Sequence, residues 1–222
     1  MNTNQKRILL FTLIPLLALV VGILWMCFSV YETTMKSFEA SQIEAQNRFF
    51  AKQKSLLTSG GQNGVYFYST VNTDEQVAQL AGMPEIEYLV FELTDISNAG
   101  FQHVADLPNL KKLTLYGVRT RIGNHGFELL RGHQSLEELT LINNDVTDSG
   151  LAVLKTLPRL VELYVCGNPS RQKFLSDAAK EQLRELPGLR KLTISGGWMS
   201  KSAVDELKTD LPNCEIQTET SY

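Results

Sequence analysis

The sequence predicts an α/β protein in which strand–helix units stack side by side along a parallel sheet, preceded by a single transmembrane helix. Three observations support this fold class. Residues 8–30 contain no charged side chain. A pattern of leucines then recurs at intervals of 24 to 29 residues over most of the remaining chain. Each copy joins a segment with alternating apolar residues, typical of a strand, to a segment with helical spacing.

The apolar segment 8–30 is long enough to cross a membrane as a helix. Its 23 residues rise ~1.5 Å each, which spans a hydrocarbon core ~30 Å thick. A cleavable signal peptide is the alternative, but it would have a shorter apolar region that ends in small residues. This segment ends Met26-Cys27-Phe28-Ser29-Val30 and has no cleavage site of the A-x-A type. The pattern therefore favours an uncleaved signal anchor.

The charges that flank this segment indicate its orientation. Lys6, Arg7 and the terminal amine precede it, whereas Glu32, Lys36 and Glu39 follow it. Positive residues favour the cytoplasmic side. We therefore expect residues 1–7 in the cytoplasm, one membrane crossing, and the rest of the chain extracytoplasmic.

Residues 31–61 are predicted to form a helical stalk or linker. They lack proline up to Leu57 and are rich in residues that favour helix. Apolar side chains recur every three or four positions, at Tyr31, Met35, Phe38, Ala45, Phe49 and Leu56. This seam, interrupted by Gln42 and Lys52, is compatible with a coiled-coil dimer. The preferred interpretation is that the membrane helix continues, packs on the first repeat, and ends at Ser59-Gly60-Gly61.

The repeats occupy residues 62–222, as about five to six copies with terminal caps. The copies LPNLKKLTL, HQSLEELTL, LPRLVELYV and LPGLRKLTI begin at Leu107, His133, Leu157 and Leu186. A weaker copy lies at residues 65–67. Leu113 and Leu115 alternate and so point to one face of a strand, while Leu151 and Leu154 have helical spacing. Neither face is buried until neighbouring copies stack.

The chain resembles the leucine-rich repeat family, over roughly residues 64–216. The pattern is clearest at Leu136, Leu139, Leu141, Asn144, Val146, Asp148, Gly150, Leu151 and Leu154. The closest subtype is the helix-containing, cysteine-containing-like one. The resemblance implies a right-handed β/α solenoid with its parallel sheet on the concave face. One departure is that the asparagine-or-cysteine position reads Thr94, Val118, Asn144, Asn168 and Gly197, so the interior side-chain ladder is expected to be incomplete.

Residues between the strand leucines face outward and form the candidate binding surface. The candidate partner-binding residues are Tyr88, Val90, Glu92, Tyr116, Ile142 and Tyr164. A solvated face does not require large apolar or aromatic side chains, and such residues are enriched at interfaces. They are alternatively a cover for neighbouring strands. The charged outward columns are interpreted as weak surface pairs.

Composition and motifs argue against other functions. A net charge of −3 is unsuited to a nucleic-acid protein, which would need a basic stripe. Cys166 and Cys214 lack metal-site spacing, and a disulfide between them is not favoured. The histidines are interpreted as surface or turn residues, with His103 in a helix and His125 and His133 in loops. The pairs Thr94-Asp95 and Thr147-Asp148 are expected to cap helices. We therefore expect no catalytic, cofactor-binding or metal-binding residue, and no enzyme.

Two functions remain. The first is a membrane-anchored module that binds an unidentified protein partner through the strand face, as the resemblance implies. The alternative is a structural or assembly subunit of a membrane or envelope complex, in which the stalk and the membrane helix matter as much as the repeats.

Overall fold

The computed structural model describes residues 3–68, 73–117, 122–167, 175–186 and 188–219, with side chains from Leu19 onward. The chain divides into two compact units, Met1–Arg48 and Phe49–Tyr222. The first unit consists of helix α1, Thr3–Thr58, whose last residues belong to the second unit. The helix ends as the glycines predict, because Gly60 adopts a φ of 72°.

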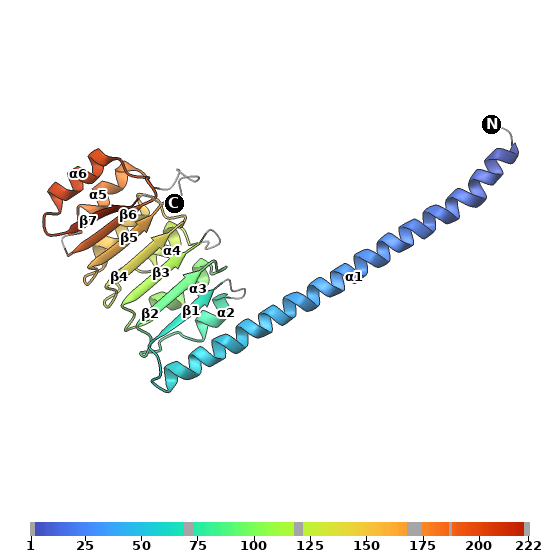
Figure 1. Cartoon of the computed structure of the whole chain (residues 1–222). Coiled ribbons are helices and arrows are strands. Elements are labelled where there is room, and N and C mark those ends of the chain that lie inside the picture. Colours follow the sequence, from blue (N-terminus) through green and yellow to red (C-terminus); the bar gives the residue numbers. More distant parts are fainter. Residues whose placement is uncertain (1–2, 69–72, 118–121, 168–174, 187, 220–222) are drawn as a thin grey trace. The chain divides into compact units, whose positions relative to one another are not determined.

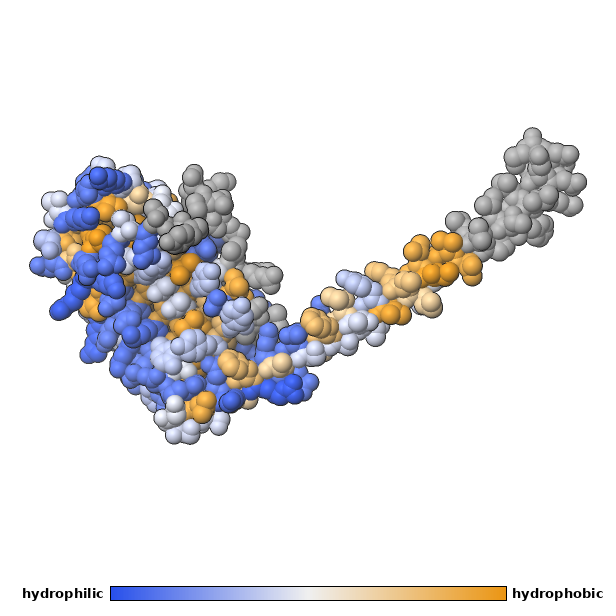
Figure 2. Space-filling model, in the orientation of Figure 1, coloured by the Kyte–Doolittle hydropathy of each residue, from blue (hydrophilic) through white to orange (hydrophobic). Residues whose placement is uncertain are grey.

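Helix α1 is long and apolar enough, by length and composition, to cross a membrane. Its side chains from Leu19 to Val30 are almost all exposed. Figure 2 shows these apolar side chains gathered along the helix beside the grey segment, whereas hydrophilic colours dominate the second unit.

The second unit is built on a seven-stranded sheet in which every neighbouring pair of strands is parallel, as predicted. The strands lie in chain order, as Figure 1 shows: β1 Gly64–Tyr68, β2 Tyr88–Glu92, β3 Lys112–Tyr116, β4 Glu138–Ile142, β5 Glu162–Cys166, β6 Lys191–Ser195 and β7 Glu215–Glu219. Consecutive parallel strands need crossovers. These contain α2 Thr73–Ala78, α3 Asn98–Ala105, α4 Asn124–Glu128, η1 Gly150–Thr156, η3 Asp177–Ala179 with α5 Lys180–Leu183, and α6 Lys201–Asp210.

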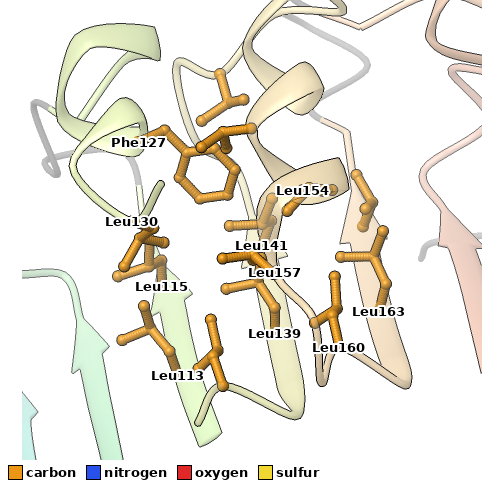
Figure 3. Close-up of a cluster of buried hydrophobic side chains, with 14 of the residues drawn as sticks. Leu113, Leu115, Phe127, Leu130, Leu139, Leu141, Leu154, Leu157, Leu160 and Leu163 are labelled. Atoms are coloured by element: carbon orange, nitrogen blue, oxygen red, sulfur yellow. The ribbon is translucent and has the colours of Figure 1, made fainter. Parts of the chain in front are cut away.

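The core lies between the sheet and these helical crossovers. Leu113, Leu115, Leu139 and Leu141 point from their strands toward the helical side, where they meet side chains such as Phe127 (Figure 3). Leu139 is only 1% exposed. Because each buried leucine contributes ~1.5–3 kcal/mol, adjacent repeats stabilise one another through this shared core.

One crossover differs in helix type from its neighbours. Gly150–Thr156 is a 3-10 helix, whereas α3 and α6 are α-helices. Leu151, Leu154 and Leu157 follow one another at intervals of three. A 3-10 helix has three residues per turn, so this spacing places Leu151 and Leu154 on one face, and Leu157 follows directly after the helix.

Polar side chains join each crossover to the next. Asp74 accepts hydrogen bonds from the Ser97 backbone N–H at 2.8 Å and from its hydroxyl at 2.5 Å. Asp148 binds Ser176 in the same way, at 2.8 and 2.6 Å. The prediction that Thr94-Asp95 and Thr147-Asp148 cap their own helices was therefore wrong. Ser97 caps α3, whereas Asp95 accepts hydrogen bonds from Thr73 and Asp148 accepts them from Ser176. The reason is that stacking brings donors of the neighbouring crossovers within hydrogen-bond distance of these carboxylates.

This arrangement explains why glycine recurs in the motif. A Cβ atom on Gly100 would lie 2.1 Å from Asp74 Oδ1, and one on Gly150 would lie 2.2 Å from Asn124 Oδ1. At both glycines, the space that a side chain would occupy is filled by a polar side chain of the preceding repeat. A motif glycine in this chain is required by packing between repeats.

The outer edge of β1 is covered by the end of α1. Gln53 accepts a hydrogen bond from Tyr66 N–H through Oε1 at 2.8 Å and donates one to Tyr66 O through Nε2 at 2.9 Å. Phe50 stacks on Phe67, with ring centroids 5.7 Å apart, and Leu57 is buried. The expected packing of the stalk on the first repeat is therefore confirmed for the last turns of the helix. Gln53 takes the place of a neighbouring strand beside Tyr66 and covers part of an otherwise open sheet edge.

Candidate functional site

The outward face of the sheet carries all six residues that the sequence proposed for partner binding. Tyr88, Val90 and Glu92 lie on β2, and Tyr116, Ile142 and Tyr164 lie on β3, β4 and β5. The strand register places Glu92 beside Tyr116 and Tyr116 beside Ile142. These three form one continuous row across the sheet, with strands ~4.8 Å apart. Their placement follows from the alternation of strand side chains, because the leucines between them fill the core.

Two aromatic residues that the sequence analysis missed extend this surface. Tyr66 and Tyr68 on β1 are 50% and 62% exposed. Tyr68 pairs with Glu92 in register, so it lengthens the row that contains Tyr116. Tyr66 packs edge-on against Tyr88, with ring centroids 5.6 Å apart. The sequence could have identified Tyr66 as outward-facing, because Val65-Tyr66-Phe67 aligns with Leu89-Val90-Phe91. The first copy matches the repeat pattern only weakly, so its outward side chains were not assigned.

We call the aromatic patch the aromatic and aliphatic outward residues of the first four strands together with Glu92: Tyr66, Tyr68, Tyr88, Val90, Glu92, Tyr116 and Ile142. Burial of the Tyr88 phenol, followed by its contact with Tyr66, raises the pKa of Tyr88 above its usual range. The raised pKa keeps the Tyr88 phenol neutral at physiological pH. The patch offers aromatic area with hydroxyl groups that can donate or accept hydrogen bonds.

The C-terminal end of the face is less accessible than the sequence suggested. Thr193 and Ser195 on β6 occupy outward columns but are buried, at 4% and 3% exposure. Trp198 follows this strand and packs over Gly167, where a Cβ atom would lie 2.4 Å from the Trp198 ring. The expectation that these columns are exposed across the whole sheet was therefore wrong at β6. On β6 only Lys191 of the outward residues stays exposed.

Tyr164 stands apart from the aromatic patch. In its register row, Thr140 and Thr114 separate it from Val90. Its hydroxyl donates a hydrogen bond to Glu219 on β7 at 3.1 Å. A hydrogen bond with Ser195 opposes the shift, but burial and the Glu219 carboxylate raise the pKa of Tyr164 overall. Tyr164 also borders a hollow of about 190 Å³ over β4, β5 and β6.

Charged residues flank the patch as surface pairs. Lys111 Nζ lies 2.9 Å from Glu87 Oε1, and Lys112 Nζ lies 2.6 Å from Glu138 Oε1. Hydrogen bonds from Lys111 and then Asn63 lower the pKa of the Glu87 carboxyl. The Glu138 carboxylate raises the pKa of Lys112. Because all four side chains are partly exposed to solvent, these ion pairs at the edge of the patch add little to the free energy of unfolding.

Leu93 ends the strand row in an unusual conformation. It follows Glu92 directly, has a φ of 52°, and is 36% exposed. The same position carries glycine in three other repeats, and two of these, Gly117 and Gly196, have positive φ. The conformation lets the N–H of Leu93 donate to Tyr116 O at 2.8 Å. Leu93 is therefore an apolar residue that is partly exposed and held in a strained conformation at the end of the patch, a feature that the sequence pattern did not reveal.

The histidines differ from the sequence interpretation in two respects. His125 lies in helix α4 and not in a loop. His133 is buried, with Nε2 3.1 Å from Leu107 O, because it occupies the position of a core leucine in other repeats. Burial lowers the pKa of His133, although the contact with the Leu107 carbonyl opposes the shift. Within the described ranges, no cluster of three or more histidine, cysteine or acidic residues has the geometry of a metal site.

Cys166 and Cys214 are both free and half-buried. Cys214 packs against the core, as expected for a small apolar residue at a leucine position. Burial raises the pKa of the Cys214 thiol, with a smaller contribution from Glu215. A raised pKa disfavours the thiolate, which is the reactive form.

No family model matches the chain. One curated protein, acidic leucine-rich nuclear phosphoprotein 32-related protein 1 from Caenorhabditis elegans, is 28% identical over 115 residues. The match covers 50% of this chain and 49% of that protein, so the chain spans about half the length of the curated relative it matches. This distant similarity and the parallel sheet both fit a leucine-rich repeat family.

Proposed function

We propose that the chain is a single-pass, membrane-anchored leucine-rich repeat protein that binds a protein partner through the outward strand face. The repeats together form a right-handed β/α solenoid of the helix-containing, cysteine-containing-like subtype, with its parallel sheet on the concave side. The aromatic patch supplies the contact area. Residues 8–30 cross the membrane, with residues 1–7 cytoplasmic and the repeats extracytoplasmic. The protein has no catalytic role, and it takes no cofactor.

The observation that carries the proposal is the row of Tyr68, Glu92, Tyr116 and Ile142 on adjacent strands, in which both tyrosines are exposed. Stability alone would favour small or polar outward residues, such as the threonines of the neighbouring row. Large aromatic side chains lose little conformational entropy on binding and bury much area, so they are frequent energetic centres of interfaces. The weak charge pairs at the rim suit a polar border around such a centre.

The proposal is tested by co-purification of the full-length tagged protein from its native membranes. Replacing Tyr68 and Tyr116 together by alanine is expected to lower partner recovery at least about tenfold, because truncating an interface anchor costs ~2 kcal/mol or more. Gln102→Ala on the helical side, an exposed position of α3, is the matched control and should leave recovery unchanged. Equal recovery from both variants would remove the strand face as the binding surface.

The alternative is an assembly subunit of a membrane or envelope complex. The exposed seam of α1 favours it, because a helix that only tethers a domain does not require apolar residues outside the membrane. A chain shortened to residues 49–222 should keep its partner if the strand face binds it, and should lose it if α1 mediates assembly. Protease added from the extracytoplasmic side should digest the repeats if the orientation is as proposed.

A further inference from the structure

The stalk portion of α1 has an apolar face that no residue of the described structure covers. Tyr31, Phe38 and Phe49 are 62%, 57% and 54% exposed, and Met35 is exposed as well. The turns that pack on the sheet use a different face, with Phe50, Gln53 and Leu57 buried. Burial of one face against β1 therefore leaves the seam free.

The seam follows a strict heptad spacing. Its members are separated by four, three, four, three and four residues, at Tyr31, Met35, Phe38, Gln42, Ala45 and Phe49. Alternating steps of three and four are the repeat of a two-stranded coiled coil. The same stretch contains five charged residues, and all lie outside the seam, at Glu32, Lys36, Glu39, Glu44 and Arg48. Two ion pairs along the helix itself, Lys36 with Glu32 and Arg48 with Glu44, involve these flanking positions.

Gln42 indicates what occupies the seam. A polar residue at a core position of a coiled coil is costly unless the partner offers a hydrogen-bonding group at the same height. A second copy aligned in parallel places its own Gln42 there, and two amides can both donate and accept. Lys52, the next seam position but one after Ala45, would meet a like charge, so the pairing ends near Phe49.

We propose that residues 31–49 form a parallel, in-register coiled coil with a second copy of this chain. The parallel alignment rests on the proposed membrane anchor, which brings every copy out of the membrane on the same side and at the same height. The paired segment is short, and isolated coiled coils of this length are marginal. Confinement of both copies to one membrane raises their effective concentration and offsets that weakness.

Disulfide crosslinking in membranes tests the proposal. The three native cysteines are replaced by serine, and one cysteine is introduced in the full chain at a time. Met35→Cys and Phe38→Cys lie in the seam, whereas Thr33→Cys and Ala40→Cys lie on the opposite side of the same helical turns. Mild oxidation is expected to give a disulfide-linked dimer at twice the chain mass for the two seam positions, at least about tenfold more than for the two controls, because paired core positions are the closest.

Equal crosslinking at all four positions, crosslinking only at the controls, or none at all would overturn the proposal. A crosslinked species of another mass would show that a different protein covers the seam, which also overturns it. A second readout avoids dependence on the cysteine variants. Copies with two different tags should co-purify, and Gln42→Glu should reduce co-purification by like-charge repulsion. Carbonate extraction of the same membranes tests the anchor separately, because a chain that is released was never embedded.

Discussion

At the scale of the residue, Leu93 combines an exposed apolar side chain with a left-handed backbone conformation. A left-handed conformation costs a residue other than glycine ~1–2 kcal/mol. The turn after β3 and the turn after β6 avoid this cost with Gly117 and Gly196. A leucine in the same turn, with its side chain partly exposed beside the aromatic patch, has no evident value for the fold.

We therefore expect Leu93→Gly to keep or raise the free energy of unfolding, by up to ~1 kcal/mol, while weakening partner binding. Relief of the left-handed strain offsets the extra backbone freedom of glycine in the unfolded chain. Urea unfolding and co-purification measure the two effects. Asn143→Gly, at a φ of 54°, is the control for stability, since asparagine tolerates this conformation better. A loss of more than ~1 kcal/mol from Leu93→Gly would show that the side chain is structural.

His133 makes the stability of the repeats depend on pH. Its folded-state pKa lies below the ordinary value of 6.5 because burial disfavours the charged ring. The unfolded chain therefore takes up the proton first as the pH falls. The stability that neutral His133 contributes is complete above about pH 6.5 and is lost as the pH falls from there through the lower folded-state pKa.

His133→Leu should remove this part of the pH dependence, because leucine occupies the position in neighbouring repeats. The free energy of unfolding is compared at about pH 7.5 and about pH 5. Asp106 and Arg131 line a surface hollow together with His133, and both are unchanged in the variant. His125→Gln, at an exposed helical position, serves as the control and should leave the dependence intact. An identical pH dependence in His133→Leu would contradict the buried neutral state.

At the scale of the element, the crossovers are held in register by side chains from neighbouring repeats. Asn124 accepts a hydrogen bond from Thr147 N–H at 2.9 Å and donates one to Thr147 Oγ1 at 2.8 Å. Its Oδ1 would lie 2.2 Å from a Cβ atom on Gly150. Gly150 and Asn124 therefore act together: the absence of a side chain at Gly150 leaves room for the hydrogen bonds that Asn124 makes to the next repeat.

Gly150→Ala is expected to destabilise the protein by ~1–3 kcal/mol, because the new methyl group displaces Asn124 from its hydrogen bonds. Asn124→Ala removes the same bonds, so the double variant should cost less than the two single costs added together. Gly123→Ala is the matched control, since its Cβ atom would have its nearest neighbour at 3.7 Å, an ordinary contact. Thermal or urea unfolding measures the free energies of the single and double variants, and strict additivity would contradict the coupling between Gly150 and Asn124.

Sequence reasoning placed the strands well because their pattern is redundant. Leucines at fixed intervals set the register of Leu113 on Leu139 and so of every outward residue between them. It failed where contacts come from another repeat. Asp148 looked like a helix cap, but its partner, Ser176, is 28 positions away. The outward position Ser195 looked exposed, and its burial depends on packing that no local pattern encodes.

At the scale of the whole molecule, the sequence predicts some properties of helix α1 and not others. The seam and the membrane-length segment of α1 are properties of composition and spacing, so the sequence alone predicts them. The role of Gln53 is different. One glutamine in a polar helical stretch gives no sign that it will bind both backbone groups of Tyr66 across a strand edge. Tertiary contacts of this kind decide which face of α1 stays free.

The central claim is that a partner protein lies against the outward face of β1 to β4. Photo-crosslinking in native membranes tests this most directly, with a photoreactive amino acid placed at Tyr116 in one protein and at Gln102 in another. The account predicts a specific crosslinked partner from position 116 that is absent from position 102 and is lost when Tyr68 is replaced by alanine. A partner that crosslinks from position 102 and not from position 116 would show that the helical side binds, and the strand-face account would be wrong.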